Sequence, residues 1–175
     1  MGTGSGSGAY KFVLVLHLLT VIIGFGGVVI AGIFGAKGAT RGGRDGQVLG
    51  ETTMDVVDNW AMWFIYAVPV LGIILIFLSE DVWDFSQAWI SLSLLLYIVA
   101  LGIVHAAHLP NLRKLNALVA ELAAGGPPAG GAGGGPPPQV EELKRRGQLA
   151  GVLGGVVNLL WVAVVFLMVW KPGFP

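Results

Sequence analysis

The chain has 175 residues, of which 55% are hydrophobic, 11% are charged and 28 are glycine. Ordinary soluble domains carry roughly 25% charged residues, so this composition excludes a soluble enzyme, a nucleic-acid-binding protein and a disordered chain. The 10 basic and 10 acidic residues cancel, and the absence of cysteine excludes disulfides and thiolate metal sites. The sequence therefore predicts an all-α, polytopic membrane protein embedded in a lipid bilayer.

Four apolar segments are long enough to cross a bilayer, which takes about 20 helical residues. They cover residues 12–34, 60–78, 89–107 and 149–170, and none of them contains Asp, Glu, Lys or Arg. Each is expected to be helical, because a lone strand would leave its backbone groups unpaired in lipid. The prediction is a four-transmembrane-helix bundle that forms one membrane domain over residues 10–175.

Two segments outside the spans have a low-complexity composition. Residues 1–9 are rich in Gly and Ser, and residues 124–138 contain only Gly, Ala and Pro. Neither composition can pack a core, so we expect a disordered N-terminus and a flexible tether. Helix is expected to resume near Gln139. Two i,i+4 ion pairs should stabilise the first turns of that helix: Glu141/Arg145 and Glu142/Arg146.

Basic residues are unevenly divided between the segments that join the spans. Residues 35–59 and 108–148 hold eight Lys and Arg, whereas the other side holds only Lys11 and Lys171. The positive-inside rule places the first two segments in the cytoplasm. We therefore expect a multi-pass protein of the bacterial cytoplasmic (inner) membrane whose N- and C-termini lie outside, together with the acidic loop at residues 79–88.

Small residues recur at helical spacing on two spans, which predicts that these faces pack closely against other helices. The stripes contain Gly24 and Gly27 on the first span, and Gly147, Gly151 and Gly155 on the fourth. Asn158 continues the second stripe near mid-span, where its amide is expected to hydrogen-bond a neighbouring helix. Pro69 lies inside the second span and frees the Ile65 carbonyl, at a kink or at a binding site.

One histidine lies inside an apolar span. His17 shares a face with Thr20 and Gly24, so it should face the bundle interior. An ionisable residue in a span marks a functional site by default. Two interpretations stay open: a neutral imidazole that hydrogen-bonds a neighbouring helix, or a ligand of haem b or a metal. His17 and His105 differ in depth by roughly 18 Å, so they cannot share one haem.

Four further ionisable residues cluster at the cytoplasmic ends of the second and third spans. His105 and His108 have i,i+3 spacing, as do Asp55 and Asp58, and both pairs lie at a similar depth. Two imidazoles and two carboxylates suit a divalent cation or a proton relay. A solvated interfacial patch is the alternative interpretation of the same four residues.

Three short motifs resemble a bacterial four-span family of predicted integral membrane proteins of unknown function. They are His17-Leu-Leu-Thr-Val-Ile-Ile-Gly-Phe-Gly-Gly27, Leu109-Pro110, and Met168-Val-Trp-Lys-Pro172, and together they extend over nearly the whole chain. The opening with Lys11, His17 and Gly26-Gly27 is also distantly similar to haem-binding protoporphyrinogen oxidases and copper-resistance D-type membrane proteins. In the oxidases the corresponding histidine is a haem ligand, which implies that role for His17.

These observations favour a non-catalytic function. We expect a small scaffold or accessory subunit of a membrane complex, or a homo-oligomer, that packs through its glycine faces. The first alternative is a haem-binding or redox protein that uses His17. The second is an ion or metal transporter that uses Asp55, Asp58, His105 and His108. This alternative is weaker, because the sequence lacks the unwound, polar half-helices that are typical of transport sites.

Overall fold

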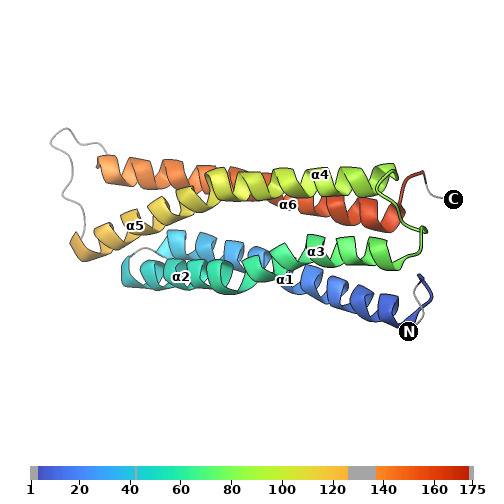
Figure 1. Ribbon diagram of the computed structural model, residues 1–175. Helices are drawn as coiled ribbons and strands as arrows, with labels where there is room; N and C mark the ends of the chain where they lie inside the picture. The colour runs from blue at the N-terminus through green and yellow to red at the C-terminus, as the bar shows by residue number, and fades with distance from the viewer. Residues whose placement is uncertain (1–3, 42, 126–136, 174–175) are drawn as a thin grey trace. The chain divides into compact units, whose positions relative to one another are not determined.

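The computed structural model describes residues 4–41, 43–125 and 137–173, and the regular structure in these ranges is entirely helical (Figure 1). Residues 126–136, which form most of the predicted tether, lie outside the described residues, as do residues 1–3 of the N-terminal segment. The elements in chain order are α1 (Gly8–Arg41), α2 (Gly43–Val56), the π-helical turn η1 (Val57–Ala61), α3 (Met62–Leu78), α4 (Ala88–Ile103), the π-helical turn η2 (Val104–His108), α5 (Leu109–Gly125) and α6 (Pro138–Trp170).

Four helical stretches are long and apolar enough to cross a membrane. They are Gly8–Arg41, Gly43–Leu78, Ala88–Gly125 and Pro138–Trp170. Each contains one of the four predicted spans, so the all-α four-span fold is confirmed. Helix also resumes where it was expected, because α6 begins at Pro138, whose fixed φ and missing N–H suit the first turn.

The segment predicted as the first cytoplasmic loop, residues 35–59, is mostly helical. α1 continues to Arg41, and α2 begins at Gly43, which has a positive φ of 54°. Hydropathy carries only a weak helix signal here, because the buried positions of α2 are small rather than apolar: Gly46, Gly50 and Thr53. Its stability comes from close packing of this small face, which hydropathy does not detect.

The described residues form two compact units. Unit 1 comprises Met1–Val28, Val57–Ala100 and Leu159–Pro175, and unit 2 comprises Val29–Val56 and Leu101–Asn158. In unit 1 the glycines of α1 bring its backbone close to α3. A Cβ added at Gly24 would lie 3.2 Å from the backbone nitrogen of Ile65, and one added at Gly27 would lie 3.2 Å from the Cβ of Ala61. These two glycines therefore set the distance between the first two spans.

Unit 2 uses the same device between α1 and α2. A Cβ added at Gly46 would lie 2.7 Å from the carbonyl oxygen of Gly38, so only glycine fits this crossing. α5 packs against α2, where the Asn116 amide donates to the Gly50 carbonyl over 3.2 Å. Close backbone contacts and hydrogen bonds from side-chain amides therefore join the helices of unit 2.

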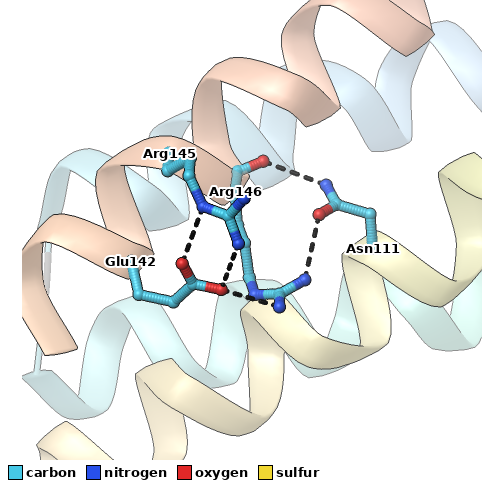
Figure 2. A network of polar contacts seen from close by, with 4 residues as sticks. All are labelled: Asn111, Glu142, Arg145 and Arg146. Atoms are coloured by element: carbon cyan, nitrogen blue, oxygen red, sulfur yellow. Dashed lines mark hydrogen bonds and ion pairs between the residues drawn. The ribbon is translucent and has the colours of Figure 1, made fainter.

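A polar network joins α5 to α6 within unit 2 (Figure 2). The buried Asn111 amide donates to the Arg146 carbonyl over 3.0 Å, and the Arg146 guanidinium donates back to the Asn111 side-chain oxygen over 3.3 Å. Glu142 pairs with Arg146 at 2.7 Å, as its i,i+4 spacing predicts. Arg145 also bonds Glu142, at i,i+3, rather than Glu141.

Candidate functional site

A cavity of about 270 Å³ lies inside unit 1. Its walls come from α1, α3, α4, α6 and the α3–α4 loop, and they are mostly apolar and aromatic. Among the described residues that line it, Lys171 is the one side chain with a permanent charge. A concave, mostly apolar space with a few polar groups is the usual form of a small-ligand site. The question is therefore which polar atoms the cavity offers.

His17 contributes one of these groups. Its side chain is only 8% exposed, and its ring lies against α3, where a Cβ added at Gly72 would be 3.5 Å from the imidazole Cε1. A Cβ at this position would make ordinary van der Waals contact with the ring, so the imidazole packs closely on this helix. The imidazole Nδ1 is buried without a partner among the described residues. A neutral ring with its proton on Nε2 would present this Nδ1 as an acceptor.

One face of α4 supplies the other polar groups. Trp89, Ser93 and Tyr97 follow one another at i,i+4 spacing, and they are 6%, 1% and 3% exposed. The indole Nε1 of Trp89 and the hydroxyl of Ser93 have no hydrogen-bond partner among the described residues. Sequence reasoning missed these residues. The signal was present, because three side chains with polar atoms on one stripe of an apolar span should face the interior rather than lipid.

Tyr97 instead supplies the hydrogen-bond donor that is missing from the backbone at Pro69. Proline has no N–H to donate to the carbonyl four residues earlier, which belongs to Ile65. The Tyr97 hydroxyl donates to that carbonyl over 2.6 Å, and both residues are buried. The ring of Tyr97 also packs on Trp161 of α6, with centroids 4.7 Å apart. Pro69 therefore marks a contact between α3 and α4 rather than an open backbone site.

Both ends of the described chain contact the α3–α4 loop in unit 1. The Gly4 N–H donates to the Leu78 carbonyl over 3.0 Å, and the Lys171 ammonium lies 4.1 Å from the centroid of the Trp83 ring. Trp83 in turn donates its indole N–H to the Tyr10 hydroxyl over 2.8 Å. We call this the loop end of unit 1, and it closes one end of the cavity.

The loop itself is acidic and exposed. Glu80, Asp81 and Asp84 lie on its surface. The backbone N–H of Ser86 donates to the Asp84 carboxylate over 2.7 Å and holds the pKa of that carboxyl below its usual value. The exposed loop therefore carries three acidic side chains, one of which accepts a backbone hydrogen bond.

The four residues of the predicted metal site have different surroundings. Asp55 is exposed at the end of α2, and Asp58 is half-buried in η1. His105 is exposed, with Nδ1 3.0 Å from the Leu101 carbonyl, whereas the His108 ring lies 3.5 Å from a Cβ added at Gly154 of α6. Within the described ranges, no three His, Asp or Glu side chains are grouped as metal ligands would be. The metal site stays a prediction from the sequence.

The α6 glycine face differs from the α1 glycines. We define it by Gly147, Gly151, Gly155 and Asn158, which recur at steps of three and four residues. A Cβ added at any of these three glycines would meet nothing within 4 Å. Asn158 is exposed, and its side chain makes no hydrogen bond to any residue that the structure describes. Among the residues that the structure describes, nothing therefore covers this face of α6.

Comparison with known families agrees with this architecture. The chain matches the family model described as "Predicted integral membrane protein (DUF2269)" over residues 11–172, a range that includes all four spans. It belongs to that family. The protein is thus an integral membrane protein, as the three sequence motifs had indicated. No curated protein and no solved structure matches the chain.

The cavity does not fit haem b, the group that the resemblance to haem-binding oxidases implies. Pockets for drug-sized ligands start at about 300 Å³, and a porphyrin is larger than such ligands. Haem b also carries two carboxylates, and Lys171 is the single cation among the described lining residues. His17 could serve as a ligand, because its buried Nδ1 has no partner among the described residues. The volume of the cavity and its single lining cation nevertheless argue against haem.

Proposed function

We propose that the protein is a non-catalytic scaffold or accessory subunit of the membrane that associates with a second copy of itself through the α6 glycine face. The observation that carries the proposal is Asn158. This amide lies near the middle of an apolar span and has no hydrogen-bond partner among the described residues. In lipid an unpaired amide is costly, so a polar partner from another helix would stabilise it.

The glycines support close approach at the same place. Gly151 and Gly155 precede Asn158 on one face of α6, and they leave the backbone uncovered over two turns. Small residues four apart let two helices approach until their backbones touch. The partner amide can then reach Asn158 at short range. By contrast, Gly24 and Gly27 of α1 already pack against α3 of the same chain.

A second copy is the occupant that suits this face. An asparagine side chain carries both donors and an acceptor, so two copies related by a two-fold axis can pair Asn158 with Asn158. The uncharged glycine surface is equally self-complementary. A buried asparagine at one helix interface is a known means of fixing register and oligomeric state.

The proposal can be tested by energy transfer between labelled copies in lipid vesicles. We expect the wild-type protein to associate, and Asn158→Leu to weaken association by roughly 0.6–1.7 kcal/mol, the range for intramembrane hydrogen bonds. Gly151→Leu should weaken it further, because a branched side chain separates the helix backbones. Gly102→Leu is the matched control, since a Cβ there also meets nothing within 4 Å but Gly102 lies outside the stripe.

Two outcomes would contradict the proposal. One is a wild-type protein that stays monomeric at every protein-to-lipid ratio. The other is a Gly102→Leu variant that weakens association as much as Gly151→Leu does. Retained near-ultraviolet circular dichroism of each variant separates lost association from lost folding.

We also propose that the loop end of unit 1 faces outward from the bacterial cytoplasmic membrane. The uneven distribution of Lys and Arg supports this orientation, because unit 1 holds only Lys11 and Lys171. The other eight basic residues all belong to unit 2. The N- and C-terminal segments contact the same loop, as a topology with both termini on one side requires.

A further inference from the structure

The unit 1 cavity contains polar atoms that no residue described in the structure satisfies. The Trp89 indole N–H, the Ser93 hydroxyl and Nδ1 of His17 are all buried without partners, and all three residues line the cavity. Each unpaired buried group carries a desolvation cost, which a bound molecule with matching polar atoms would offset. The three side chains come from two helices and line one cavity, so a single ligand class should match them together.

The chemistry of the three groups restricts this class. An indole N–H only donates, a serine hydroxyl donates or accepts, and Nδ1 of a neutral His17 accepts when the ring proton is on Nε2. The ligand therefore needs an acceptor oxygen for Trp89 and an atom that can donate to His17. An uncharged ligand suits the cavity, because Lys171 opposes a cation and the mostly apolar walls would desolvate an anion.

The walls restrict its shape. The rings of Phe25, Trp89 and Tyr97 line the cavity, and aromatic walls favour a flat ring through stacked or edge-on contacts. The volume of about 270 Å³ suits a single or fused small ring and not a macrocycle. Because apolar helices form the walls of the cavity, a ligand that dissolves in the bilayer suits it best.

We propose that this cavity binds the ring of a lipid-soluble quinone, with Trp89 and Ser93 donating to a quinone carbonyl and His17 accepting from a hydroxyl of the quinol form. The two redox forms of such a ring offer the acceptor and the donor that the three side chains need. The inference concerns binding alone and is independent of association through α6.

Equilibrium dialysis of the purified full-length protein in detergent tests this inference. The probes are a benzoquinone with a short alkyl tail and the matching alkylbenzene, which has the same ring and tail but no oxygen. We expect saturable binding of the quinone and markedly weaker binding of the alkylbenzene. Trp89→Phe keeps the aromatic bulk and removes the N–H, so it should raise the dissociation constant about fivefold, as should Ser93→Ala.

Trp63→Phe is the matched control, because Trp63 is 70% exposed and does not line the cavity. It should leave the dissociation constant unchanged. Equal affinity for the quinone and the alkylbenzene would overturn the inference, since the cavity would then select only for apolar bulk. No quinone binding to the folded wild-type protein would also overturn it, and so would a Trp89→Phe variant that binds like Trp63→Phe. Each variant's near-ultraviolet circular dichroism verifies its fold.

Discussion

Replacing Tyr97 by Phe removes one hydroxyl group from the interior of unit 1 and leaves the Ile65 carbonyl without a donor. Both residues are buried, and the hydroxyl-to-carbonyl distance is 2.6 Å. Intramembrane hydrogen bonds contribute about 0.6 kcal/mol on average and up to about 1.7. An orphaned buried acceptor costs about 1–3 kcal/mol. We therefore expect Tyr97→Phe to lower the free energy of unfolding by about 1–2 kcal/mol.

Pro69 provides the control that isolates this bond. Pro69→Ala restores an N–H that can donate to the Ile65 carbonyl within α3, so the tyrosine hydroxyl becomes dispensable. In the Pro69→Ala background, Tyr97→Phe should therefore cost only about 0.5 kcal/mol, which gives a coupling energy of about 1 kcal/mol. Four proteins complete the cycle: the wild type, each single variant and the double variant.

Reversible unfolding in mixed detergent micelles measures the four free energies. The reasoning is refuted if Tyr97→Phe costs the same in both backgrounds, because the hydroxyl would then contribute nothing to the freed carbonyl. A Tyr97→Phe variant as stable as the wild type would refute it as well. Retained quinone binding in the double variant would further show that the cavity tolerates the change.

Two other predictions concern unit 2 and the orientation of the chain. Asn111→Leu should lower the free energy of unfolding by about 1–3 kcal/mol, because it removes the amide that donates to the Arg146 carbonyl. Thermal unfolding in detergent measures this change. An unchanged transition would show that the network in Figure 2 does not stabilise the fold. A membrane-impermeant thiol reagent applied to intact cells should label Ser86→Cys but not Thr40→Cys, whereas both should react after permeabilisation; the reverse pattern would invert the topology.

The membrane fold could be predicted from the sequence because hydropathy over 20 residues is a property of the chain alone. The same is true of the interruption at Pro69, since the missing N–H follows from the residue type. The side chain that replaces the missing N–H as the donor to the Ile65 carbonyl could not be predicted. Tyr97 lies in another span, and its approach to Ile65 depends on how α3 and α4 are rotated, which composition does not determine.

The glycine stripes illustrate a second limit. Spacing indicated that Gly24 and Gly151 lie on packing faces, but it could not tell which face packs within the chain. The structure places Gly24 against Ile65, whereas Gly151 meets nothing within 4 Å. The helix α2 was missed for a related reason. Its buried residues are Gly and Thr, and hydropathy does not distinguish a small packed face from a loop.

The position of Lys171 has a consequence for biosynthesis. The Lys171 ammonium lies over the ring of Trp83. The ribosome adds Lys171 only after α4, α5 and α6 have been made. At ordinary elongation rates this interval is on the order of ten seconds. During that time the nascent chain presents the indole rings of the loop end without their cation, and the space beside His17 lacks its α6 wall. The lining of this cavity is therefore complete only after the last helix has been made.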